Sequence, residues 1–351
     1  MSGNTAQPDT SQSENASTPT LDGPPPFNNP SADVILRSAD HVDFFVRKGI
    51  LSEASPVFEA MFSLPPVPEN RKRKAADFDA SNDEEYRDGV PVVTATEDSD
   101  TLDALLRLCY PMDDPQLATP HAACAVLVAA RKYDMDYAAK RASAQFIAHA
   151  RADPLRVYAL AIRNCWEDET RAAALHSLDT PLDGVYIAEM EDISAGAYFR
   201  LLEYHRACGA AASALVAVSP NDRLDRNKAR RTLAWLKQAD SDWLWLSCRY
   251  CAASTFAIGE QSVIKRAPAW WRQYLLDTAA ALTAKPHRST VEDPSLSSVV
   301  AHLAMDTDFC SYCRSAFAMD YDCLKSLASF TDQLADEIDN VVAKVELGIE
   351  R

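Results

Sequence analysis

A change in hydrophobic periodicity near the start of the chain constrains its fold more than any other feature. Two short apolar runs, 34–36 and 42–45, flank a polar turn and are typical of a β-hairpin. Over 50–61 the apolar residues recur every three or four positions, which is helical spacing. Because proline is tolerated best in the first turn of a helix, Ser55-Pro56 predicts one short helix over 48–54 and a second that begins at Ser55. The pattern therefore predicts a small sheet followed by helices, an α+β arrangement.

The following hundred residues continue this mixed pattern. Residues 63–90 lack periodicity and mix prolines with a basic and an acidic run, which predicts a long mobile loop. A strand over 91–96 follows, and Ser99 or Asp100 can cap the next helix. The Ala-rich segment over 120–150 is predicted to be helical.

The second half of the chain is predicted to be mostly helical. Asp153-Pro154 combines an N-cap with a first-turn proline and opens a segment with an apolar stripe. Apolar residues recur every three or four positions from about 320 to 347, which predicts a long helix with an acidic outer face. Further helices are predicted over 168–178, 194–208 and 222–238.

Charge and composition exclude several classes of protein. Lys and Arg number 35 against 51 Asp and Glu, and the net charge of −16 repels phosphate backbones and anionic lipid headgroups, so we expect no nucleic-acid or membrane partner. The closest of the nine glycines, Gly184 and Gly196, lie twelve residues apart, which excludes GxGxxG, P-loop and GxSxG motifs.

The N-terminal segment and the apolar runs bear on localisation. No apolar run approaches the roughly 20 residues that span a bilayer, and residues 1–30 lack a secretory signal and are predicted to be a disordered tail. The sequence therefore predicts a soluble intracellular protein, cytoplasmic or nuclear. The basic run 71–74 resembles a nuclear-import signal, and a solvated loop is the alternative.

A series of spaced motifs resembles the BTB/POZ domain. The first group of matching positions is Asp33-Val34, Phe44, Lys48, Leu51, Ser55-Pro56, Phe58 and Met61-Phe62. The match continues in order through Leu102, Leu105, Leu106, Tyr110-Pro111 and residues 125–135. The departures are Val46 and Arg47, where the family has Ala and His, and a longer, more charged loop over 65–90. The resemblance implies a helical cluster with a small sheet over residues 31–150, and no catalysis.

The resemblance also implies a function in protein–protein interaction. Many members of the family form homodimers through the first helix and hairpin, and some bind a cullin as substrate adaptors of ubiquitin ligases. A transcription-associated scaffold is a further possibility. The resemblance makes six residues candidates for a partner or dimer interface: Asp33, Arg47, Lys48, Ser55, Phe58 and Met61. Asp33 and Arg47 are expected to face each other near a dimer pocket, with an ordinary surface ion pair as the alternative.

The remainder of the chain resembles known proteins less closely. Residues 151–212 resemble the helical extension that follows many BTB domains, and residues 213–351 have a general likeness to the C-terminal regions of fungal BTB proteins. No activity follows from that likeness. The tryptophans between 235 and 271 are expected to pack in a core.

Two CxxC pairs, Cys248 with Cys251 and Cys310 with Cys313, are candidate ligands of a structural zinc ion. Two such pairs can complete a tetrahedral Cys₄ site, which leaves no open position for catalysis. The 58 intervening residues exceed the usual spacing of about 15–20. Three interpretations therefore remain open: structural zinc, core cysteines without metal, and redox or catalytic thiols. The last requires a cysteine of low pKa beside His287 or His302.

Overall fold

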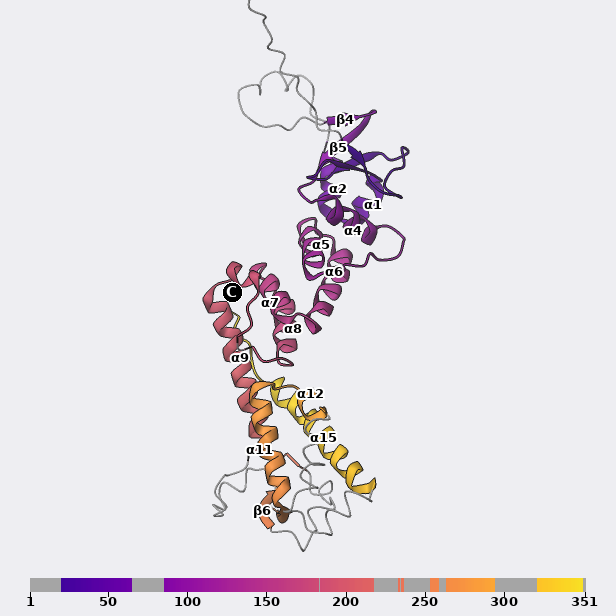
Figure 1. Cartoon of the computed structure of the whole chain (residues 1–351). Coiled ribbons are helices and arrows are strands. Elements are labelled where there is room, and N and C mark those ends of the chain that lie inside the picture. The colour runs from indigo at the N-terminus through magenta and orange to yellow at the C-terminus, as the bar shows by residue number, and fades with distance from the viewer. Residues whose placement is uncertain are drawn as a thin grey trace, which may run out of the picture. The chain divides into compact units, whose positions relative to one another are not determined.

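In a computed structural model of the chain, the described residues are 20–64, 85–182, 184–217, 233, 235–236, 253–258, 263–293 and 321–349. The chain divides into two compact units, the N-terminal unit (residues 1–146) and the C-terminal unit (residues 147–351) (Figure 1). The sequence predicts a further boundary near residue 212, but helix α9 (Ala195–Ala214) crosses it and packs against α11 (Ala269–Ala284) and α15 (Tyr321–Val342). The predicted helical extension and C-terminal region therefore belong to one unit.

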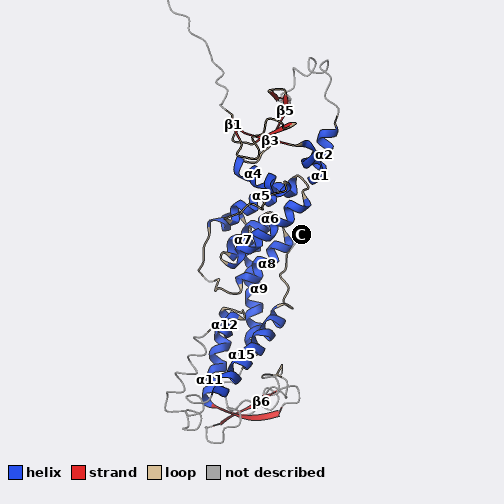
Figure 2. Ribbon diagram, turned by 90° about the vertical axis from the view of Figure 1, so that its right-hand side faces the viewer, coloured by secondary structure: helices blue, strands red, loops and turns tan. Residues whose placement is uncertain are grey.

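A five-stranded mixed sheet with the order β1-β3-β2-β5-β4 organises the N-terminal unit. Strands β2 (Val34–Arg37) and β3 (Val42–Val46) form the predicted antiparallel hairpin. Strand β5 (Val90–Thr94) pairs parallel with β2 at the centre of the sheet. Figure 2 shows this sheet and a separate strand pair in the C-terminal unit, and the other labelled elements are helices.

The fold begins earlier than the sequence predicts. Strand β1 (Leu21–Asp22) pairs with β3, and Phe27 is fully buried with its ring edge-on to Tyr110, the centroids 5.2 Å apart. The prediction of a disordered tail up to residue 30 is therefore wrong for residues from 20 onward. A two-residue strand and a single phenylalanine among prolines are too short to produce a periodic signal.

The end of the predicted loop 63–90 is also ordered. Strand β4 (Glu85–Arg87) pairs antiparallel with β5 through Asp88 and Gly89, whose φ angles are 52° and 80°. Asp-Gly is a strong signal for a two-residue hairpin turn because both central positions need positive φ. The Asp-Gly dipeptide can be read in the sequence, but the acidic run directly before it led to the prediction of a loop over the whole of 63–90. Residues 65–84 lie outside the described part of the chain.

The two helices that follow the hairpin form as predicted. Helix α1 (Lys48–Ala54) ends before Ser55, and α2 (Pro56–Ser63) begins immediately after it. The Ser55 hydroxyl accepts a hydrogen bond from the Phe58 N–H at 3.1 Å and donates one to the Tyr133 carbonyl at 2.5 Å. Phe58 stacks on the Tyr133 ring with the centroids 4.9 Å apart. Ser55 and Phe58 therefore anchor α2 to the helical part of the unit.

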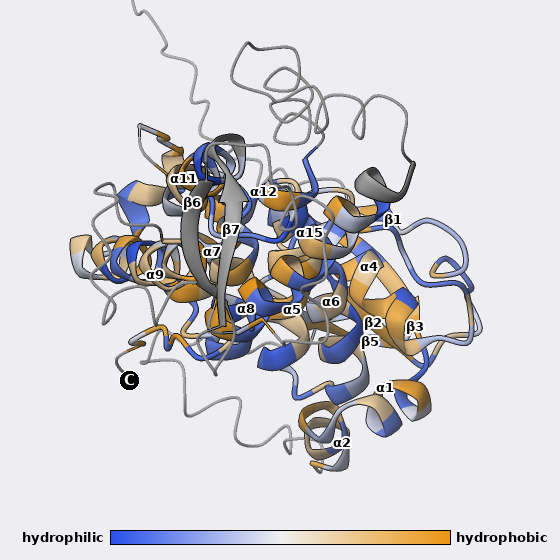
Figure 3. Cartoon of the chain, turned by 90° about the horizontal axis from the view of Figure 1, so that it is seen from below, coloured by the Kyte–Doolittle hydropathy of each residue, from blue (hydrophilic) through white to orange (hydrophobic). Residues whose placement is uncertain are grey.

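Helices α4 (Ser99–Cys109), α5 (Pro120–Lys132) and α6 (Asp136–Ala148) complete the core of the N-terminal unit. Asp98, one residue before the predicted cap, accepts the Thr101 N–H at 2.8 Å and begins α4. Strands β2 and β3 are mostly apolar (Figure 3), and α4 is amphipathic, with one apolar face. The buried leucines of α4 pack in this core and are Leu102, Leu105, Leu106 and Leu108.

The C-terminal unit is mainly helical. Asp153 caps α7 (Pro154–Arg163) as predicted, and α8 (Glu167–Ser177) and α9 lie close to their expected positions. The short elements are η1 (His149–Arg151), η2 (Ala188–Asp192) and α12 (Ser289–Glu292). Strands β6 (Ala253–Ile258) and β7 (Val263–Pro268) form an antiparallel hairpin that the sequence analysis missed.

Aromatic residues form the core between α11 and α15. Trp271 and Phe330 are fully buried, with their ring centroids 4.7 Å apart, and Tyr274 stacks on Trp271 at 5.4 Å. This confirms for Trp271 the prediction that the tryptophans pack in a core. Gly209 lets α9 approach α11, since a Cβ there would lie 2.6 Å from the Thr283 carbonyl oxygen.

No helix among the described residues is long and apolar enough to cross a membrane.

Candidate functional site

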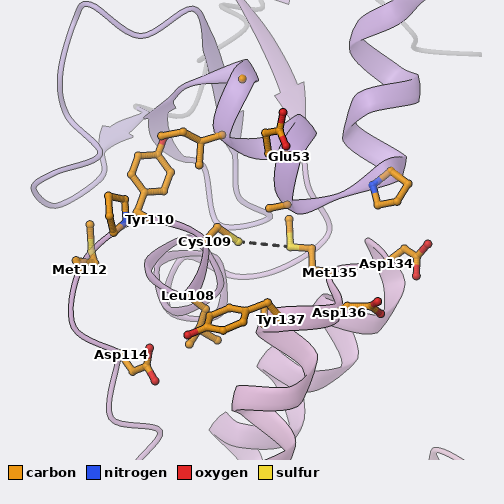
Figure 4. A pocket seen from close by; sticks show the side chains of 16 residues that line it. Glu53, Leu108, Cys109, Tyr110, Met112, Asp114, Asp134, Met135, Asp136 and Tyr137 are labelled. Carbon is orange, nitrogen blue, oxygen red and sulfur yellow. Dashed lines mark hydrogen bonds between the residues drawn. The ribbon is translucent and has the colours of Figure 1, made fainter.

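A groove of about 1060 Å³ runs over the surface of the N-terminal unit (Figure 4). Helix α1 forms one wall, and the start of α6 lies opposite it. The end of α4 and the loop 110–114 close one end. Figure 4 places Glu53 across from Tyr137, with Met112 and Asp114 on one side and Asp134 and Asp136 on the other. Segments far apart in the sequence thus share one concave surface.

The inner surface of the groove is apolar. Leu108 and Met135 are buried beneath it, the Cys109 sulfur lies 3.7 Å from the Met135 sulfur, and Tyr137 is 65% exposed. Asp134 has a φ of 54°, a left-handed conformation that aspartate tolerates better than most residues. This residue reverses the chain between α5 and α6, so that Met135 is buried while Tyr137 remains at the surface.

Carboxylates surround this apolar surface. Glu53, Asp114, Asp134 and Asp136 line the groove, and no lysine, arginine or histidine lies among the described residues that line it. Asp114 forms an ion pair with Arg141 outside the groove. An apolar surface rimmed by negative charge is complementary to a partner segment that is apolar on one face and basic at its edges.

Cys109, a described residue that lines the groove, is poorly suited to nucleophilic catalysis. Burial raises the pKa of the Cys109 thiol to about 11, whereas a reactive cysteine needs a lowered pKa. Burial also raises the pKa of Tyr110, whose hydroxyl accepts the Arg47 N–H at 2.9 Å. Burial therefore keeps the Cys109 thiol and the Tyr110 hydroxyl in their neutral forms.

Four of the six predicted interface residues have side chains that reach the surface. Asp33 accepts the Lys48 N–H at 2.7 Å, and the Arg47 guanidinium donates to the Ser31 hydroxyl at 2.7 Å. Asp33 and Arg47 thus each have a different partner close to the start of α1. The Lys48 ammonium lies 5.5 Å from the centre of the Phe62 ring.

The other predicted interface residues divide between core and surface. Ser55 is fully buried and Phe58 is 2% exposed, so in the N-terminal unit their side chains hold α2 and present no surface. Met61 is 36% exposed on α2, beside Val57 at 38% and Leu64 at 71%. Four residues of the original set, Asp33, Arg47, Lys48 and Met61, are therefore available to a partner.

Sequence reasoning missed the residues that shape the groove. Glu53 and Tyr137 belong to no motif that the sequence shows, and Asp134 lies within the matched segment 125–135 without a role assigned to it. The available signal was Asp134-Met135-Asp136-Tyr137, where a lone apolar residue between two acids interrupts the Ala-rich segment 120–150. Which of these side chains face outward depends on tertiary packing.

The predicted zinc ligands Cys248, Cys251, Cys310 and Cys313 lie outside the described residues. Across the ranges that the structure describes, no three His, Cys, Asp or Glu side chains group as a metal site. The zinc site therefore stays a prediction. The His287 ring lies 2.9 Å from the Ser289 hydroxyl and 3.2 Å from the Asp179 carboxylate, and His302 also lies outside the described residues.

Comparison with known proteins identifies the N-terminal unit. No curated protein matches the chain. The family model of the BTB/POZ domain matches residues 27–150, about a third of the chain. The match begins at the buried Phe27 and spans strands β2 to β5, helices α1, α2, α4, α5 and α6, and the groove. Residues 27–150 of this chain are a BTB/POZ domain, a protein-interaction domain.

Proposed function

We propose that this chain is a non-enzymatic interaction protein that self-associates and recruits a partner through its BTB/POZ domain. The observation that supports this most strongly is the groove beside α1, which combines an apolar inner surface with four carboxylates and no cation among its described lining residues. Apolar grooves with a charged rim are typical of surfaces that bind an amphipathic helix.

The charges around the groove favour a basic partner segment. Glu53 and Asp136 are exposed on opposite walls, and the chain as a whole carries a net charge of −16. Such a field accelerates encounters with cationic partners and repels acidic ones. Two finer functions fit this proposal: a substrate adaptor that binds a cullin, and a transcription-associated scaffold, acting in the cytoplasm or the nucleus.

Self-association is proposed to use a different part of the domain. Asp33, Arg47 and Lys48 lie together where β2 and α1 begin. Met61 and Val57 are exposed on α2, and Leu64 is exposed directly after it. BTB domains commonly self-associate and bind other proteins. Self-association and recruitment through separate surfaces would bring two partner segments into one assembly, which raises avidity.

Charge reversal in the groove tests recruitment. The double variant Glu53→Lys with Asp136→Lys is expected to weaken binding of a groove partner at least about tenfold, because attraction becomes repulsion. Glu59→Lys with Asp100→Lys is the matched control, since it makes the same charge change at two exposed helical positions away from the groove. Binding is measured by quantitative co-purification from the native cell and by titration with a purified cullin N-terminal domain.

The outcomes separate the proposed functions. If the groove variant loses binding to a cullin and the control does not, the substrate-adaptor function is supported. If the groove variant loses binding to other proteins and no cullin is recovered with either chain, a scaffold that recruits through the groove is supported. If the groove variant retains every partner that the control retains, the groove is not the recruitment surface.

A further inference from the structure

Two of the described residues that line the groove are aromatic, and one of them presents its ring to a partner. Tyr110 is half-buried, with its ring edge-on to Phe27 and its hydroxyl bound to the Arg47 N–H. Tyr137 lies in the first turn of α6, is 65% exposed, and has no hydrogen bond or ring contact with another described residue. An exposed tyrosine offers a partner a large and rigid contact surface.

Two carboxylates beside this ring keep capacity to accept hydrogen bonds. Glu53 lies across the groove from Tyr137 (Figure 4), is exposed, and forms no ion pair with another described residue. Asp114 closes one end of the groove, and Arg141 Nε and Nη2 both donate to its Oδ2. Asp114 Oδ1 therefore has no hydrogen bond to a described residue. A partner can supply donors to both carboxylates.

An exposed ring with carboxylates on two sides suits a planar cation better than a compact one. The guanidinium of arginine stacks face to face on an aromatic ring, and the N–H groups at its edges donate to carboxylates. The ammonium of lysine is a compact and strongly hydrated charge that satisfies both contacts less well. The negative field of the groove attracts the two cations alike, so the ring is what distinguishes them.

We propose that Tyr137 makes the groove selective for arginine over lysine in the partner segment. The guanidinium stacks on the Tyr137 ring and donates to Glu53 on one side and to Asp114 Oδ1 on the other. This inference deepens the function proposed above and rests on recruitment of a basic segment through the groove. It names the residue type that such a segment presents there.

The probes are two synthetic amphipathic peptides of about 18 residues, long enough to form a helix. Both carry leucine on the apolar face, and the basic positions beside it are all arginine in one peptide and all lysine in the other. Binding of each fluorescein-labelled peptide to the full-length chain is measured by fluorescence anisotropy at about 0.15 M salt. We expect the wild type to bind the arginine peptide at least about fivefold more tightly than the lysine peptide.

Substitutions of Tyr137 test its part in this preference. Tyr137→Ala is expected to bind the two peptides equally, whereas Tyr137→Phe keeps the ring and is expected to keep the preference for arginine. Because Tyr137 is exposed, both variants are expected to retain the helical circular dichroism of the wild type. Tyr186→Ala is the matched control, since Tyr186 is 67% exposed in the C-terminal unit and does not line the groove.

A neutral variant of Glu53 tests the carboxylate contact. Glu53→Gln is expected to reduce the preference for the arginine peptide, because an amide oxygen accepts more weakly from a guanidinium than a carboxylate does. Glu59→Gln, at an exposed position of α2 that does not line the groove, is the matched control and is expected to keep the full preference.

The charge-reversed variant Glu53→Lys with Asp136→Lys separates this inference from the proposed function. If the wild type binds both peptides equally and the charge-reversed variant loses both, the groove recruits basic segments without selecting arginine, and only the selectivity proposal is overturned. A preference for arginine that survives Tyr137→Ala also overturns it. If the charge-reversed variant binds both peptides as tightly as the wild type does, the selectivity proposal and recruitment through the groove are both wrong.

Discussion

Replacing Asp43 with alanine is expected to lower the free energy of unfolding of the BTB/POZ domain by about 3–5 kcal/mol. Asp43 is fully buried on β3, and its carboxylate accepts from Arg37 Nε at 2.7 Å and from Arg87 Nη1 at 2.6 Å. Arg37 is itself 7% exposed. Removing the carboxylate takes away the buried acceptor that Arg37 and Arg87 share and breaks the link between β3 and Arg87 at the end of β4. Denaturant titration at neutral pH measures the loss.

Asp22→Ala is the matched control for this change. The Asp22 carboxylate also binds Arg87, at 2.8 Å, but its side chain is 53% exposed. A solvated ion pair of this kind contributes about 0–1 kcal/mol. Equal effects of Asp22→Ala and Asp43→Ala would contradict the assignment of Asp43 as the buried centre of the network.

The Asp43 network also predicts a pH dependence. Burial pushes the pKa of Asp43 upward, but hydrogen bonds and charges from Arg37 and Arg87 outweigh it and hold the pKa below its ordinary value of 3.8. The unfolded chain therefore binds the proton first on acidification. The stabilisation is complete above pH 3.8 and is lost as the pH falls through the folded pKa. Hence the difference in the free energy of unfolding between wild type and Asp43→Ala persists at neutral pH and shrinks as the pH falls below 3.8.

Phe330→Ala is expected to destabilise the C-terminal unit by about 3–5 kcal/mol. Phe330 is fully buried on α15, and its ring contacts Trp271 at 4.7 Å, Tyr274 at 6.3 Å and Trp235 at 5.9 Å between centroids. Truncation leaves a cavity among three aromatic rings and loosens α15 from α11. Tryptophan fluorescence during denaturant unfolding reports the change because Trp271 and Trp235 surround the altered site.

Phe199→Ala provides the control in the same unit. Phe199 is 56% exposed on α9. Its removal is expected to change stability by no more than about 0.5 kcal/mol. A small effect of Phe330→Ala, similar to that of Phe199→Ala, would contradict the central place of Phe330 in the aromatic core.

Local sequence signals predicted much of the fold. The β2–β3 hairpin, the break at Ser55 and helix α15 depend on residues that are neighbours in sequence, so periodicity and capping reveal them. The sequence did not predict strand β1 and the buried Phe27, because their order comes from contact with a strand about twenty residues later. Strand β4 is followed by an Asp-Gly turn, a local signal that could have predicted the hairpin with β5, but the charged run before it favoured a loop.

Less of the candidate site than of the fold could be predicted from the sequence. The groove joins α1, the end of α4 and the start of α6, and its geometry depends on the left-handed Asp134. A family motif marks positions without separating core from surface, which is why Ser55 and Phe58 were grouped with the exposed Arg47 and Met61. Tertiary packing decides which of these side chains a partner can reach.

Sedimentation equilibrium of the full-length chain tests the central claim, assembly through the BTB/POZ domain, most directly. We expect the mass of two chains of 38.6 kDa each for the wild type. The double variant Arg47→Glu with Met61→Asp, at two exposed positions, is expected to sediment as one chain with unchanged circular dichroism. Glu59→Lys with Asp100→Lys is expected to remain dimeric. A wild-type chain that sediments as a single chain at every concentration would contradict self-association.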